Sequence, residues 1–136
     1  MSFDLRNFAD RYTIAWCSQN ASAVAGFFAP NGSLTINDGS PSVARTAITA
    51  AAQDFMTAFP DLRVMLDGIS VEGDRSIYRW TLDGHNTGPG GTGAHVHISG
   101  YEEWCIGDDG LIAESLGHFD AAEYRRQLRR AEGGSR

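Results

Sequence analysis

Apolar residues recur every three or four positions near the start of the chain and every second position in its latter half. Over residues 5–16 the apolar positions Leu5, Phe8, Tyr12 and Trp16 fall on one stripe of a helix. The side chains of Tyr12 and Trp16 are therefore expected to face the protein interior.

Two further helices are predicted before residue 60. The first lies within residues 20–30, where Ser22 can act as the N-cap and Pro30 begins a turn. A short strand over residues 33–37 and a turn over residues 38–41 follow it. The second helix spans residues 42–59. Its apolar stripe consists of Val43, Ala47, Ala51, Phe55, Met56 and Phe59.

From Leu62 onward the apolar period is two, which predicts strands. The alternation that starts at Leu62 changes parity by Ile69, so a β-bulge is expected at Asp67 and Gly68. The remaining strands are predicted over residues 76–86, 95–106 and 111–119, and a last helix over residues 121–130.

Helices grouped before strands predict an α+β domain, because such helices cannot cover both faces of a parallel sheet. We expect a curved antiparallel or mixed sheet that wraps, as a cone, around three N-terminal helices. The interior of that cone is the natural place for a pocket. The domain is expected to span residues 1–131, followed by a flexible tail over residues 132–136.

Glu102 interrupts an otherwise apolar strand face. Alternate side chains of a strand share a face, and this one consists of Val96, Ile98, Gly100, Glu102, Trp104 and Ile106. A carboxyl group on such a face is removed from water, which raises its pKa and suits it to acid or base chemistry. The alternative is an edge strand, from which Glu102 reaches solvent.

The composition argues against two classes of partner. Lysine and arginine number 11 against 17 acidic residues, and the net charge of −6 disfavours nucleic acid and anionic membranes. The first ten residues lack the order of a secretory signal, and no apolar run approaches the roughly 18 residues of a membrane span. We therefore expect a cytoplasmic protein.

Five segments resemble SnoaL-like polyketide cyclases, which belong to the ketosteroid isomerase-like, nuclear transport factor 2-like superfamily. They are AFPDLRV (58–64), RWTLDG (79–84), TG (87–88), SGYEEW (99–104) and DGLIAE (109–114). The resemblance covers nearly the whole chain, and its order of elements agrees with the α+β cone.

The resemblance implies a cofactor-free enzyme that removes a proton α to a carbonyl and stabilises the enolate. Glu102 falls where the isomerase branch carries a protonated, oxyanion-binding acid, and Tyr12 where it has a pocket tyrosine. Asp38 lies about two residues beyond the position of its catalytic base. A second explanation for Asp38 is structural, since aspartate in a turn often bonds its own backbone.

Two positions depart from the cyclase branch. Where that branch tends to carry an acid/base aspartate in the last strand, this chain has Gly117. Where it favours a histidine, this chain has Asn86, with His85 one position earlier. Because glycine cannot transfer a proton, the sequence predicts a pocket more firmly than a reaction.

His95 and His97 share one strand face, roughly 7 Å apart, and two such imidazoles can chelate a metal. The run from His95 to Glu102 resembles the H-x-H-x4-E ligands of cupins. Glu102, however, has the opposite parity, and the downstream cupin motif is missing. We therefore interpret these histidines as outer-face residues at a subunit contact and assign no metal ligand, and a metal site at His95 and His97 stays as the second alternative function.

The leading hypothesis is an enzyme, or a former enzyme, that binds a hydrophobic, carbonyl-bearing small molecule without a cofactor. In it Glu102 is the acid and Asp38 the base. Apolar and stacking surface would come from Tyr12, Trp16, Phe55, Phe59, Trp80 and Trp104. The alternative is a non-catalytic ligand-binding or dimerisation module, whose cone is filled by side chains and whose Glu102 is salt-bridged, for instance to Arg79. A homodimer through the outer sheet face is expected.

Overall fold

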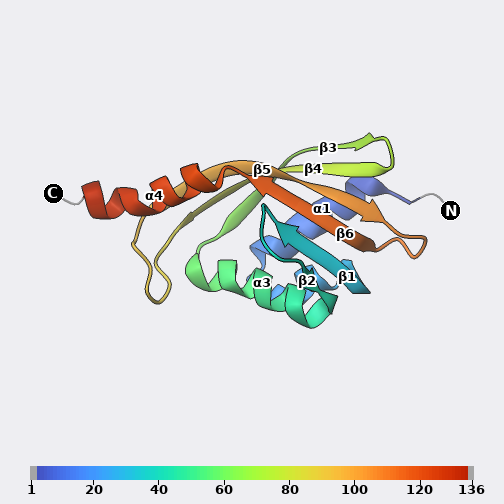
Figure 1. Cartoon of the computed structure of the whole chain (residues 1–136), viewed down its shortest axis with the longest axis horizontal. Helices are drawn as coiled ribbons and strands as arrows, with labels where there is room; N and C mark the ends of the chain where they lie inside the picture. Colours follow the sequence, from blue (N-terminus) through green and yellow to red (C-terminus); the bar gives the residue numbers. More distant parts are fainter. Residues whose placement is uncertain (1–2, 135–136) are drawn as a thin grey trace.

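The computed structural model describes residues 3–134, with side chains described over residues 3–129. Four helices and six strands occur in this part of the chain (Figure 1). In chain order they are α1 (Leu5–Cys17), α2 (Ala21–Ala25), β1 (Phe28–Ile36), β2 (Ser42–Val43), α3 (Ala44–Ala58), β3 (Arg63–Glu72), β4 (Arg75–His85), β5 (His95–Ile106), β6 (Ile112–Phe119) and α4 (Ala121–Gly134).

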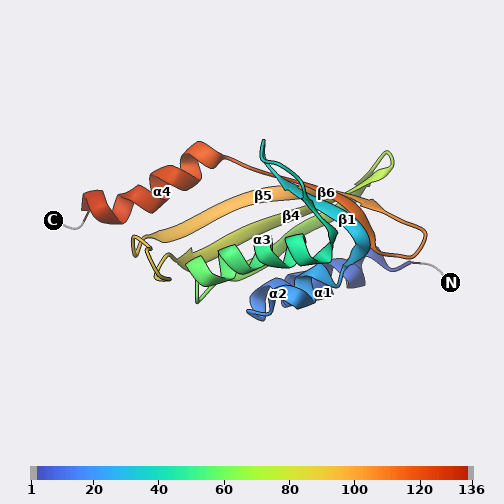
Figure 2. The same cartoon turned by 60° about the horizontal axis from the view of Figure 1, so that its bottom comes forward.

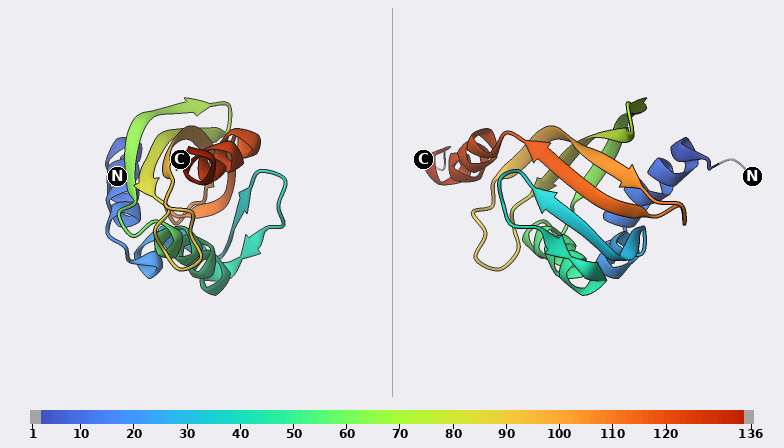
Figure 3. Two further views of the ribbon diagram at one scale, coloured as in Figure 1. Left: turned by 90° about the vertical axis from the view of Figure 1, so that its left-hand side faces the viewer. Right: turned by 45° about the vertical axis from the view of Figure 1, so that its right-hand side comes forward.

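The strands form one mixed sheet in the order β2-β1-β6-β5-β4-β3. Only β1 and β6 run parallel, and every other neighbouring pair is antiparallel. The sheet curves around α1 and α3 (Figures 2 and 3), with α1 packed on β3 and α3 on β1. The predicted α+β fold with a curved, mixed sheet is confirmed.

The first helix has the predicted inward face. Its N-cap Asp4 accepts a hydrogen bond from the backbone N–H of Asn7 at 3.0 Å, and Phe8, Tyr12 and Trp16 are buried. The cap of α2 differs from the prediction. Asn20 caps this helix by accepting from the N–H of Ala23, and the hydroxyl of Ser22 instead donates to the Asn20 side chain at 2.7 Å.

The third helix starts two residues later than predicted, because Ser42 and Val43 pair with β1 as a short strand. Val43 is 57% exposed and belongs to no core stripe. The side chains of α3 that are buried are Ile48, Ala52 and Met56. The predicted stripe was therefore rotated by about one residue over most of its length.

Strand boundaries also differ at β1, which starts at Phe28 rather than at residue 33. Its pairing with β6 is irregular between Phe28 and Ser33, around Pro30. This irregularity hides the strand from a simple alternation rule. The predicted bulge in β3 is confirmed, since the register with β4 shifts between Leu66 and Gly68.

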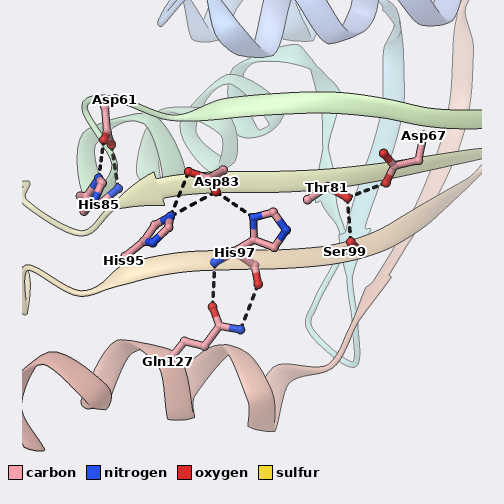
Figure 4. A network of polar contacts seen from close by, with 9 residues as sticks. All are labelled: Asp61, Asp67, Thr81, Asp83, His85, His95, His97, Ser99 and Gln127. Carbon is pink, nitrogen blue, oxygen red and sulfur yellow. Dashed lines mark hydrogen bonds and ion pairs between the residues drawn. The ribbon is translucent and has the colours of Figure 1, made fainter. Parts of the chain in front are cut away.

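Helix α4 covers a strand edge. β6 pairs with β5 only from Gly100 onward, which leaves residues 95–99 of β5 without a neighbour on that side. The Gln127 side chain fills this gap: it accepts from the His97 N–H at 2.7 Å and donates to the His97 carbonyl at 3.0 Å (Figure 4). The helix runs to Gly134, beyond the predicted residue 130, and residues 135–136 lie outside the described part. Over the described residues no helix is long and apolar enough to cross a membrane.

Candidate functional site

An apolar cavity of about 70 Å³ lies between the helices and the curved sheet. The helices contribute Trp16, Phe55 and Tyr124, and the strands contribute Ile36, Val64, Tyr78, Trp80, Leu82, Ile98, Glu102, Gly117 and Phe119. This volume is well below the roughly 300–1,000 Å³ of sites for drug-sized ligands. The cavity therefore suits a small ligand, and a larger one requires lining aromatic side chains to move.

Glu102 is buried, with 7% of its surface exposed, and it lines this cavity. Three uncharged groups donate hydrogen bonds to it. The indole N–H of Trp104 and the hydroxyl of Ser115 each reach Oε1 at 2.8 Å. The hydroxyl of Tyr12 lies 3.0 Å from Oε1 and 3.2 Å from Oε2. Glu102 is thus held by α1, β5 and β6 without a cationic partner among the described residues.

Burial raises the pKa of Glu102 above its ordinary value, and the bonds from Trp104, Ser115 and Tyr12 only partly oppose this. Oε1 already accepts hydrogen bonds from Trp104 and Ser115. The proton of the neutral carboxyl group therefore belongs on Oε2. The hypothesis of a salt bridge to Arg79 is wrong. The guanidinium of Arg79 contacts Glu72 at 3.3 Å and Ser70 at 3.1 Å instead, and the side chains of Arg79 and Glu72 are exposed at the sheet surface.

The predicted aromatic residues divide into two groups. Trp16, Phe55 and Trp80 line the cavity, whereas Tyr12, Phe59 and Trp104 lie in the fully buried core and do not line it. Tyr12 and Trp104 contact the site through Glu102. The ring of Trp104 also stacks on that of Tyr78, with centroids 4.8 Å apart.

Sequence reasoning missed several lining residues, notably Tyr78, Phe119 and Tyr124. Tyr78 has the same parity along β4 as Trp80 and Leu82, and all three side chains line the cavity, so strand alternation could have found it. Burial raises the pKa of the Tyr78 and Tyr124 hydroxyls, so neither serves as a base near neutral pH.

Asp38 does not meet Glu102 in the cavity. It is exposed at the turn after β1 and lines a separate, polar groove together with Tyr101 and His118. The imidazole of His118 stacks on the ring of Tyr101 and bonds Glu103 at 2.7 Å. Among the described residues that line the cavity, Glu102 is the only carboxyl group.

Comparison with known proteins identifies the family of this chain. A family model described as SnoaL-like polyketide cyclase matches residues 6–128, most of the chain. The chain belongs to this family. No curated protein gives a significant match.

Solved structures with the same fold are distant in sequence from this SnoaL-like protein. A ketosteroid isomerase-like protein from Catenulispora acidiphila DSM 44928, in complex with trimethylamine, is 15% identical with a TM-score of 0.77, over 89% of this chain and 91% of that one. A nuclear transport factor 2-like protein of unknown function from Burkholderia pseudomallei K96243 is 18% identical with a TM-score of 0.78, over 94% and 98%. TerC, co-crystallised with polyporic acid, is 11% identical with a TM-score of 0.74, over 91% and 97%. At these identities the likeness shows the fold alone.

In this SnoaL-like protein Gly117 is the direct cross-strand partner of Glu102. A Cβ atom at Gly117 would lie 3.8 Å from Cγ of Glu102 and 3.4 Å from the carbonyl oxygen of Thr35, which are ordinary contacts. The position therefore has room for a side chain but supplies none. Among the described residues, the cavity wall beside Glu102 therefore holds no second carboxyl group and no imidazole.

The histidines of β4 and β5 form carboxylate pairs on the outer face of the sheet (Figure 4). His97 Nδ1 lies 2.7 Å and His95 Nε2 lies 3.1 Å from the Asp83 carboxylate, and His85 Nδ1 lies 2.7 Å from Asp61. Hydrogen bonding, first of all from His97, lowers the pKa of Asp83. No group of three or more potential ligands in the described part of the chain is arranged to hold a metal ion. Glu102 faces the interior and the two histidines face outward, so the cupin-like run does not bring its three side chains together around one metal ion.

Proposed function

We propose that this SnoaL-like protein binds a small, hydrophobic, carbonyl-bearing molecule in the cavity, and that neutral Glu102 donates a hydrogen bond from Oε2 to the carbonyl oxygen. One observation carries the proposal. A buried carboxyl group whose Oε1 accepts hydrogen bonds from Trp104, Ser115 and Tyr12 lies on the wall of an otherwise largely apolar cavity. A neutral acid in such a place is suited to bind a developing oxyanion.

The chemistry follows from that bond. A donor on the carbonyl oxygen withdraws electron density and makes the hydrogen on the adjacent carbon more acidic, which favours the enol. Isomerase and cyclase reactions of carbonyl compounds share this step. Since no second carboxylate or imidazole lines the described cavity, water is the acceptor of the carbon-bound proton in this proposal.

Two solved structures with the same fold contain a small molecule, which supports the presence of a ligand site. The Catenulispora protein binds trimethylamine, and TerC was crystallised with polyporic acid. Neither ligand identifies the one for this chain. The volume of about 70 Å³ favours a small ring as the first probe.

Cyclohexanone and methylenecyclohexane form a matched pair of probes, because they differ mainly in the oxygen atom. We expect the ketone to bind more tightly, by roughly 3- to 10-fold for one hydrogen bond. The preference should be present at low pH and fall as pH rises through the pKa of Glu102, since ionisation removes the donor. NMR shifts of the Gly117 amide, as each probe is added, measure both affinities.

Glu102→Gln supplies the control. Its amide oxygen can replace Oε1 and its NH2 group can donate from the position of Oε2, so the ketone preference should persist and become independent of pH. Equal binding of the two probes by the wild type, or a ketone preference that grows with pH, would contradict the proposal.

A non-catalytic binding module is the second candidate, and the small cavity favours it, since aromatic side chains fill much of the cone. Deuterium exchange at the α carbons of cyclohexanone in D2O separates the two functions. If the protein is a catalyst, the wild type must exchange these hydrogens faster than buffer does. Glu102→Gln, which cannot transfer a proton, must exchange them more slowly than the wild type. Ketone binding without faster exchange assigns the binding function alone.

We also propose a cytoplasmic homodimer that associates through the outer face of the sheet. The exposed pairs that Asp83 and Asp61 form with histidines on β4 and β5 offer polar contacts there. Sedimentation equilibrium of the wild type and of Asp83→Asn measures the oligomeric state and its dependence on this face.

A further inference from the structure

The indole N–H of Trp80 is a buried donor without an acceptor. Over the described residues only two buried side-chain nitrogen or oxygen atoms lack a hydrogen-bond partner, Nη1 of Arg75 and Nε1 of Trp80. Arg75 still pairs with Glu114 through Nη2 at 2.9 Å. Trp80 has no such second group, and its side chain lines the cavity beside Glu102. A buried donor without an acceptor costs free energy, so the missing acceptor of Trp80 requires an explanation.

The position of the Trp80 ring is fixed by its neighbours. Gly100 is its cross-strand partner, and a Cβ atom at Gly100 would lie only 2.6 Å from Cζ2 of the indole. The six-membered ring thus fills the space that a side chain at position 100 would take. Phe119 contacts the indole edge-on, with ring centroids 6.0 Å apart. The indole ring that carries the N–H therefore has little freedom to turn.

Two other polar groups at or behind the cavity wall already have partners. The hydroxyl of Tyr78 shares a hydrogen bond of 2.5 Å with that of Thr13. The N–H of Trp104, behind the wall, donates to Glu102. Trp80 thus differs from both, because its side chain lines the cavity and its buried N–H has no partner.

We propose that Trp80 determines ligand specificity by donating its indole N–H to a second oxygen of the ligand. Glu102 binds one carbonyl oxygen and Trp80 binds another, so the cavity selects a compact apolar ring that carries two acceptor oxygens, as in a cyclic dione. This inference rests on the proposed function, which supplies the first carbonyl contact.

The test compares cyclohexanone with cyclohexane-1,4-dione and with 2,2-dimethylcyclohexane-1,3-dione, which hold their two oxygens at different separations. We expect at least one dione to bind roughly 3- to 10-fold more tightly than the monoketone, the gain of one neutral hydrogen bond. Trp80→Phe should remove this advantage, so that the ratio of the dione affinity to the cyclohexanone affinity falls to about one.

A second measurement uses the wild type alone and does not depend on the variant's folding. The indole proton of Trp80, detected by nitrogen-15 NMR, should move downfield when the preferred dione is added and much less when cyclohexanone is added. If cyclohexanone binds but no dione binds better and the indole proton is indifferent to the second oxygen, the inference is overturned and the proposed function stands. If none of the ketones binds, both fail.

Discussion

Replacing Glu102 with leucine is expected to lower the free energy of unfolding by about 3 kcal/mol or more, among the largest effects of any single change in this chain. Leucine fills a similar space but accepts no hydrogen bond. The donors of Tyr12, Trp104 and Ser115 are then left in the interior without an acceptor. Each buried, unpaired donor costs about 1 to 3 kcal/mol.

Urea denaturation measures this loss, and two variants provide controls. Glu102→Gln keeps an acceptor at the position of Oε1, so its loss should be no more than about half that of Glu102→Leu. Glu103→Gln alters the adjacent glutamate, which faces outward and pairs with His118, and should change stability by less than about 1 kcal/mol. A Glu102→Leu protein as stable as Glu103→Gln would show that the three donors do not depend on Glu102.

Gly100→Ala is the second change with a large expected effect, a loss of at least about 3 kcal/mol. The added methyl group would collide with the backbone oxygen of His118 and lie 2.6 Å from the Trp80 ring. The backbone cannot yield without breaking the β5–β6 pairing at Phe119. The same collision would displace the indole from the cavity wall.

Gly68→Ala is the matched control, because Gly68 also lies in a strand and a Cβ atom there meets nothing within 4 Å. It should shift the urea midpoint only slightly, whereas Gly100→Ala should shift it strongly and change the near-ultraviolet circular dichroism of tryptophan. Equal midpoints for the two variants would show that the contact between Gly100 and Trp80 is not tight.

Periodicity was a good guide where one face of an element is buried. The interior position of Glu102 followed from the parity of Val96, Ile98 and Trp104, all of which are buried. The bulge near Gly68 followed in the same way from a change of parity. In both cases the spacing of apolar residues within one strand was enough for the prediction.

Contacts between distant segments could not be read from local patterns. Ser115 reaches Glu102 only because β5 and β6 pair in one particular register. The inward face of α1 was predictable, but the bond from Tyr12 across 90 residues to Glu102 was not. Asp38 looked like a base because of its place in the chain, yet the turn holds it in a groove apart from the cavity.

The volume of the cavity could not be predicted from the sequence either. A curved sheet around helices predicts a hollow, but the fit of Tyr12, Tyr78 and Trp104 to one another decides how much of it remains. Such packing depends on rotamers and ring angles that alternation does not encode. The result is a small cavity with two notable polar groups, the carboxyl of Glu102 and the N–H of Trp80.

The central claim is that Glu102 stays protonated where ordinary carboxyl groups have ionised. Carbon-13 NMR of protein labelled at the glutamate carboxyl carbons tests it, with Glu102→Gln identifying the resonance. We predict that Glu102 titrates above the other glutamates, because burial raises its pKa more than its three donors lower it. Titration of Glu102 together with the other glutamates, or below them, would show an ionised carboxylate held by those donors and would contradict the account.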